Sequence, residues 1–115
     1  MKRCFAITIL LLFGVLSNIH GAECDNTIEI TENRKVVLPE RVHSSKYARR
    51  GLWLQNTSDK GVLCAAGAKT KKHLLPGDIW EEKAEGGHLK DDDLEFEEVS
   101  CVTSSGTATV KGCDY

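Results

Sequence analysis

The chain has 115 residues, of which 28% are charged and 41% hydrophobic, and its formal net charge at pH 7 is −2. A chain of this length holds one small domain and excludes a multidomain architecture. The charge is slightly negative overall, and we expect no nucleic-acid partner.

The first 22 residues have the pattern of a secretory signal peptide. Met1-Lys2-Arg3 is basic, residues 4–16 are almost entirely apolar, and residues 17–22 are short and end in small side chains. An apolar run of this length is too short to span a membrane. We therefore predict cleavage after Ala22, a single domain over residues 23–115, and a secreted or periplasmic location without a membrane span.

The rest of the chain has the alternation of polar and apolar residues that is typical of short strands. Residues 40–50 and 83–93 are polar or charged and are predicted to form long loops, and the basic residues 69–72 to form a connection. The predicted strands cover residues 27–31, 34–38, 51–55, 62–66, 78–81, 94–102 and 107–111.

The turn sequences between these segments predict an antiparallel arrangement. We expect 62–66 to pair with 51–55 across the turn at 56–61, and Ser104-Ser105-Gly106 to join 94–102 and 107–111 as a hairpin. The spacing of the turns favours an all-β fold, a small antiparallel β-sandwich or barrel of about seven or eight short strands.

Four of the five cysteines follow the predicted cleavage site, an even number that favours two disulfides in an exported domain. Spacing alone permits three pairings. We prefer Cys64–Cys101 across the core and Cys24–Cys113 joining the two ends of the domain. A loop as long as that closed by Cys64–Cys101 is worth about 3–4 kcal/mol in the chain-entropy model.

Charge is distributed unevenly along the chain. Residues 31–72 carry a local charge of +7, and residues 78–98 carry a local charge of −8. We expect the two regions to offset each other in the fold, and the alternative is that the polarity steers a partner of mixed charge.

No pattern in the sequence indicates catalysis or a metal site. His43, His73 and His88 lie in three different predicted loops without zinc-site spacing, and paired cysteines offer no thiolate nucleophile. The acidic run at 91–93 lacks the ligand alternation of a calcium loop and is interpreted as solvated surface. We expect no metal, no cofactor and no enzymatic activity.

The candidate contact residues surround the third predicted strand. Trp53 points away from Leu52 and Leu54 because side chains alternate along a strand, so it lies on an outer surface if the leucines face the core. The alternative is that both faces of this strand are covered, at a sandwich edge or by self-association. The tentative partner-binding set consists of Trp53 together with the basic and aromatic residues before it: Lys46, Tyr47, Arg49 and Arg50. The acidic loop 85–93 is a further candidate.

Residues 56–58 read Asn-Thr-Ser, a glycosylation sequon in a predicted turn. Its use would require a eukaryotic secretory pathway.

The stretch from Arg49 to Val110 resembles small β-domains of phage virion-associated proteins. The resemblance lies in Gln-Asn-Thr-Ser at 55–58, Leu-Pro-Gly at 75–77 and Ser-Gly-Thr-Ala-Thr-Val at 105–110. It covers about half of the chain, names no specific family, and implies a structural or attachment module without catalysis.

These observations predict a secreted, non-enzymatic binding module of the structural or adhesion type, associated with a virion or another surface. The alternative is a soluble periplasmic inhibitor or immunity protein that blocks an exported enzyme. The expected partner is another protein or a surface glycan, and self-association is a further expectation.

Overall fold

The computed structural model describes residues 24–115, so the predicted signal peptide over residues 1–22 lies outside the described part of the chain. The described residues form eight strands and one short helix. In chain order these are β1 (Thr27–Ile30), β2 (Lys35–Leu38), β3 (Gly51–Asn56), β4 (Val62–Ala66), β5 (Thr70–Leu74), β6 (Ile79–Lys83), α2 (Asp92–Phe96), β7 (Val99–Val102) and β8 (Ala108–Asp114).

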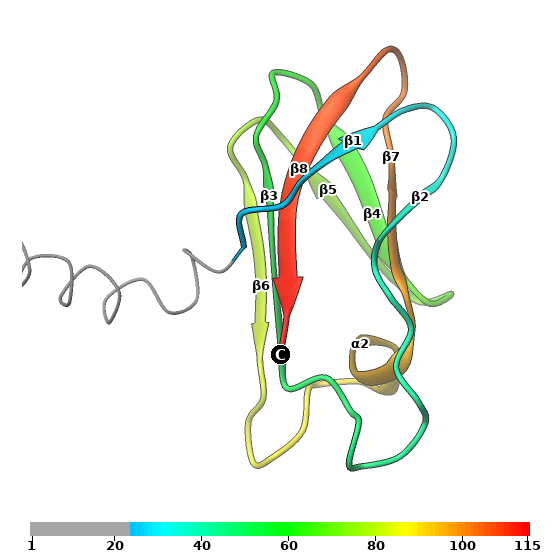
Figure 1. Cartoon of the computed structure of the whole chain (residues 1–115), viewed down its shortest axis with the longest axis vertical. Helices are drawn as coiled ribbons and strands as arrows, with labels where there is room; N and C mark the ends of the chain where they lie inside the picture. Colours follow the sequence, from blue (N-terminus) through cyan, green and yellow to red (C-terminus); the bar gives the residue numbers. More distant parts are fainter. Residues whose placement is uncertain (1–23) are drawn as a thin grey trace, which may run out of the picture.

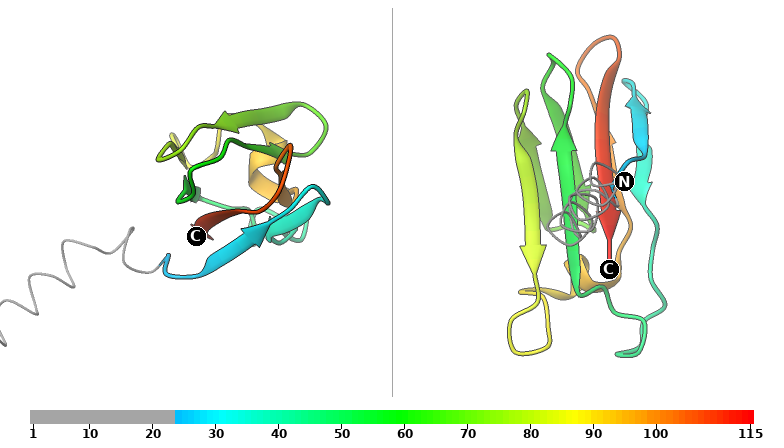
Figure 2. Two further views of the ribbon diagram at one scale, coloured as in Figure 1. Left: turned by 90° about the horizontal axis from the view of Figure 1, so that it is seen from above. Right: turned by 60° about the vertical axis from the view of Figure 1, so that its left-hand side comes forward.

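The strands form two four-stranded antiparallel sheets, and the fold is a sandwich, not a closed barrel (Figures 1 and 2). Sheet A has the order β1-β8-β3-β6, and sheet B has the order β2-β7-β4-β5. The strands pair from the middle of the chain outward: β4 with β5, β3 with β6, β2 with β7 and β1 with β8. These nested pairs alternate between the two sheets, which is the jelly-roll arrangement of a β-sandwich.

Alternation along the strands creates the core between the sheets. Leu52 and Leu54 of β3, and Val62 and Cys64 of β4, are fully buried, while the residues between them face outward. Trp80 is also buried, at 2% exposure. Both expected disulfides, Cys24–Cys113 and Cys64–Cys101, are present.

The position of the second disulfide corrects one expectation. Cys64 on β4 and Cys101 on β7 are directly opposite residues of adjacent strands in sheet B. The bond therefore joins two strands within one sheet and does not cross the core between the sheets. Both residues point inward and are at most 1% exposed, so the bond lies on the core-facing side of β4 and β7.

Two predicted strand pairings are wrong. β3 belongs to sheet A and β4 to sheet B, and likewise β7 belongs to sheet B and β8 to sheet A. The connections at 57–61 and 103–107 therefore cross from one layer to the other (Figure 1). Among the described strands the short hairpin is β4–β5. The expected basic connection at 69–72 is largely the strand β5.

The predicted strand over 94–102 is also partly wrong, because residues 92–96 form α2 and the strand begins at Val99. The Asp91 side chain caps the helix by accepting a hydrogen bond from the Leu94 amide at 3.0 Å. Acidic residues fill the first turn, where they complement the helix dipole. Helix α2 lies at one end of the sandwich (Figure 1), and its residue Leu94 is fully buried.

Hydrogen bonds join the crossing connections at the opposite end of the sandwich. The Thr103 amide donates to Thr31 O at 2.9 Å, and the Thr103 hydroxyl donates to Gly61 O at 3.1 Å. Asn56 is fully buried, and its side-chain amide donates to Lys60 O at 2.6 Å and to Leu74 O at 2.9 Å. The folded domain therefore does not present the amide of the Asn56 sequon for glycosylation.

We expect Asn56→Ala to reduce the free energy of unfolding by about 2–3 kcal/mol. It removes the hydrogen bonds that the side-chain amide donates to Lys60 O and to the buried Leu74 O, and those that its oxygen accepts from Ser58. Asp59→Ala, in the same turn but exposed, should change it by less than about 0.5 kcal/mol. Urea denaturation of both variants measures the difference. Equal stability of the two variants would contradict the role given to Asn56.

Candidate binding face

The outer face of sheet B carries a row of side chains from three adjacent strands. Leu63 on β4 lies directly opposite Val102 of β7 on one side and His73 of β5 on the other. Because Val62 and Cys64 point into the core, alternation directs Leu63 and its two opposite residues outward. Leu63 is 44% exposed.

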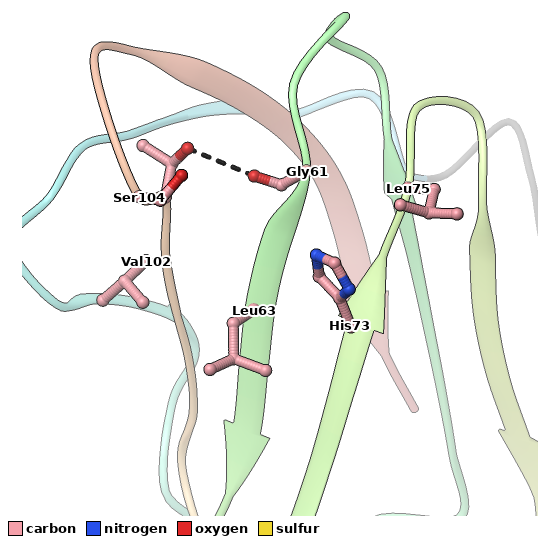
Figure 3. Close-up of a pocket in the computed structure, with 7 residues that line it drawn as sticks. Gly61, Leu63, His73, Leu75, Val102 and Ser104 are labelled. Carbon is pink, nitrogen blue, oxygen red and sulfur yellow. Dashed lines mark hydrogen bonds between the residues drawn. The ribbon is translucent and has the colours of Figure 1, made fainter.

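This row forms the floor of a hollow of about 390 Å³, called here the upper hollow (Figure 3). Its lining is Gly61, Leu63, His73, Leu75, Val102, Thr103 and Ser104. A Cβ added to Gly61 would lie 2.9 Å from Nε2 of His73, so glycine at this position leaves space for the imidazole. Leu75 is 54% exposed, and the hollow thus combines exposed aliphatic surface with an imidazole and hydroxyl groups.

Two residues further along the same strands, the outer side chains are small. Ala65 of β4 lies opposite Ser100 of β7, and these two residues line a second cavity of about 390 Å³, called here the lower hollow. Its lining is Arg34, Ala65, Gly67, Glu97, Glu98 and Ser100. The ion pair between Arg34 and Glu98, with N and O atoms 2.8 Å apart, lies beside it.

The upper and lower hollows therefore lie on one face, along β4 and β7, and we call this surface the sheet-B face. Its free edge is β5, which displays Lys71, Lys72 and His73 as exposed side chains. None of these three forms an ion pair with another described residue. Lysines on an edge strand discourage strand addition by other sheets. Lys71, which lies opposite the outward-facing Ala65, also gives the sheet-B face a basic border.

The uneven charge of the sequence is only partly offset in the fold. Among the ion pairs of residues 24–115, Arg34–Glu98 joins the basic region 31–72 to the acidic region 78–98. Lys83 and Lys90 pair instead with Glu81 and Glu82 within the acidic region. The basic border of β5 remains available to an acidic partner.

The predicted contact residues around β3 do not form a single exposed patch. Trp53 lies on the outer face of sheet A, opposite Glu81 and Cys113, as alternation predicts, and is half-buried. Tyr47 is 48% exposed, and the ammonium of Lys46 lies 5.5 Å from the centroid of its ring. Arg50 is exposed and donates a hydrogen bond to Gly87 O at 3.3 Å.

Arg49 is completely buried, which is a correction to its expected role as a contact residue. Its Nε atom lies 2.9 Å from Oδ2 of Asp114, and its Nη2 donates to Pro39 O at 2.9 Å. Its Nη1 donates to Leu94 O at 2.7 Å and to Glu97 O at 3.0 Å, at the C-terminal end of α2. All of the guanidinium nitrogens form hydrogen bonds inside the domain, so a partner does not reach this side chain in the folded protein.

The acidic loop over 85–93 has a structural role at its C-terminal end. Asp91 caps α2 and also accepts a hydrogen bond from the Thr70 hydroxyl at 3.2 Å, and Asp93 accepts one from the Lys69 amide at 3.4 Å. These aspartates support the β4–β5 turn. They do not converge on a common point as calcium ligands would.

The strand alternation that placed Trp53 outward also placed Leu63, Val102 and His73 outward, although the sequence did not single them out. The signal that would have identified the sheet-B face is Leu63 itself, a large apolar residue at a position of β4 that alternation directs outward.

Within residues 24–115 there is no helix long and apolar enough to cross a membrane. Comparison with protein-family models, with curated proteins and with solved structures found no match for this chain.

Proposed function

We propose that the protein is an exported, non-catalytic binding module of the structural or adhesion type, and that it binds a protein partner through the sheet-B face. The observation that carries this proposal is the outward-facing row Val102–Leu63–His73, which lines the upper hollow, with the lower hollow further along β4 and β7 on the same face. Export is supported by the two disulfides, which persist in oxidising compartments.

The chemistry of the upper hollow favours a protein partner over a surface glycan. Its aliphatic side chains are Leu63, Leu75 and Val102, and its lining contains no phenyl, phenol or indole ring for a sugar to stack on. Apolar side chains at the centre of a contact with polar groups around it are typical of protein interfaces. Lys71 at the edge of the face suits a partner that has acidic side chains beside an apolar anchor.

The shape of the face favours the structural or adhesion reading over the inhibitor or immunity reading. A protein that blocks an active-site cleft inserts a protruding segment into it, whereas the sheet-B face is hollowed and receives a side chain.

We expect Leu63→Asp to weaken the complex with the partner at least tenfold, because it places a carboxylate at the apolar centre of the contact. Val42→Asp is the matched control, since Val42 is 65% exposed and lies outside both hollows. The producing culture is fractionated by sedimentation and size exclusion, and the bound fraction of each variant is measured after its thermal stability has been checked.

Co-sedimentation of the wild type and Val42→Asp with particles or envelope, and release of Leu63→Asp, are the expected results. A soluble one-to-one complex would favour the inhibitor reading. If Leu63→Asp remained bound and Trp53→Ala were released, the contact would lie on sheet A. A free monomer under all conditions would contradict the binding function.

A further inference from the structure

The three potential metal ligands Glu40, His43 and Glu97 meet beside α2, at the end of the sandwich opposite the crossing connections. One ligand atom from each side chain lies within 4.8 Å of the other two. Two of the residues come from the loop after β2, and Glu97 follows α2, so residues more than fifty positions apart meet here. The local spacing of the sequence could not reveal this group.

The backbone on both sides of the group is held in place by hydrogen bonds. Arg49 donates to Pro39 O, next to Glu40, and to Glu97 O. The Arg41 amide donates to Phe96 O at 2.7 Å. The two segments that supply the ligands are therefore fixed against each other by buried or main-chain contacts, and they do not depend on an ion to meet.

The imidazole of His43 is also oriented. Its ring stacks on Phe96, with centroids 4.7 Å apart and an interplanar angle of 18°. A stacked imidazole has lost part of its rotational freedom before any ligand binds, which lowers the entropic cost of binding. Phe96 neighbours Glu97 in sequence, so the same segment positions the ring and supplies a carboxylate.

The charge of the group also favours a cation. Glu40 and Glu97 bring two carboxylates together, and neither forms an ion pair with another described side chain. Two carboxylates and a neutral imidazole balance the charge of one divalent ion. An imidazole with two carboxylates suits Zn²⁺ and related transition metals, whereas Ca²⁺ takes six to eight oxygen ligands.

We propose that Glu40, His43 and Glu97 form a binding site for a divalent transition-metal ion of the Zn²⁺ class. Tetrahedral zinc with ligand bonds of about 2.0–2.1 Å requires ligand atoms about 3.4 Å apart. The side chains need to close by little more than 1 Å, a small movement for exposed or half-buried groups. Three protein ligands leave one coordination position open. Glu97 also lines the lower hollow, so the site adjoins the sheet-B face, although it does not depend on the proposed function.

The test is calorimetric titration of the secreted, disulfide-bonded protein with ZnCl₂. We expect one ion per chain, and we expect His43→Gln and Glu97→Gln each to weaken binding more than about tenfold. His88→Gln is the matched control, because His88 is exposed and also lies beside a carboxylate, with Nδ1 3.3 Å from Oε2 of Glu95. It should bind zinc like the wild type. Bound zinc should raise the melting temperature of the wild type and not that of His43→Gln.

A cooperative thermal transition without metal shows that a variant is folded. If His43→Gln fails this control, the zinc affinity of Glu97→Gln is used in its place. Absence of zinc binding by the wild type would overturn the proposal, and so would equal losses in His43→Gln and His88→Gln. Tighter binding of CaCl₂ than of ZnCl₂, insensitive to His43→Gln, would also overturn the assignment.

Discussion

Arg49→Met is expected to reduce the free energy of unfolding by about 3–5 kcal/mol, the usual cost of removing one partner of a buried ion pair. The guanidinium is fully buried and contacts Asp114 as well as three main-chain carbonyls. Methionine retains much of the apolar volume but donates no hydrogen bond, so the three carbonyls lose this donor and Asp114 keeps only its ion pair with Arg41. Urea denaturation followed by circular dichroism measures the loss.

The position of these acceptors explains why the effect should be large. Two of them, Leu94 O and Glu97 O, lie at the C-terminal end of α2, which has no basic residue in its own last turn. Arg49 supplies the missing positive charge from the loop before β3. The Arg49 side chain therefore joins α2 to two other parts of the domain. It contacts the start of the β2–β3 loop through Pro39 O and the end of β8 through Asp114.

Arg50→Met is the matched control for Arg49→Met. Its side chain is exposed and makes one hydrogen bond of 3.3 Å, so its loss should cost less than about 1 kcal/mol. Arg49→Lys should fall between the two, because an ammonium keeps the charge but cannot reach all four acceptors at once. Equal stabilities of Arg49→Met and Arg50→Met would contradict the structural role of Arg49.

The sequence predicted the strands better than it predicted their partners. Alternation is a local property, and it identified β3, β4 and β8 because each has one face in the core. Pairing depends on which sheet the chain enters after a turn. The turns at 56–61 and 104–106 have the polar, glycine-containing composition of hairpins, yet they cross between layers because the strands pair outward from β4–β5. The composition of a turn does not distinguish a hairpin from a connection that passes to the other sheet.

The helix and the buried arginine were missed for related reasons. Leu94-Glu95-Phe96-Glu97 alternates as a strand does, but the Asp91 cap and the acidic first turn favour a helix over these residues. Arg49 lies in a basic run that has the composition of an exposed loop. Its acceptors are 10 to 65 residues away in sequence, so no local pattern marks it as buried.

The proposed contact and metal sites both depend on the packing of distant segments. Leu63 faces outward by alternation alone, but the hollow around it also needs Val102 and His73 from the adjacent strands of sheet B. Glu40 and Glu97 meet because Arg49 and Arg41 hold their backbones together. The sequence shows which residue types are present, but these residues come close together only because of the order of the strands in the two sheets.

Removal of either disulfide by paired Cys→Ala substitutions is expected to lower the free energy of unfolding by about 4–5 kcal/mol. The cross-links close loops of 89 residues for Cys24–Cys113 and 37 residues for Cys64–Cys101. The chain-entropy model gives about 4.6 kcal/mol for the longer loop and about 3.8 kcal/mol for the shorter one, because the entropy grows only with the logarithm of loop length. A loss of this size is a large part of the 5–15 kcal/mol that stabilises an ordinary domain, and thermal denaturation of the two double variants measures it.

The two double variants should differ in where the native state opens, although their global losses are similar. Cys64–Cys101 joins β4 to β7, the strands that carry the sheet-B face, so its removal should speed amide hydrogen exchange in those strands. Cys24–Cys113 ties the segment before β1 to β8, so its removal should speed exchange in β1 and the end of β8 and leave β4 protected. Local opening of this kind is measured by native-state exchange. The same exchange pattern in both variants would mean that the two sheets open as one unit and that neither cross-link stabilises its own sheet separately.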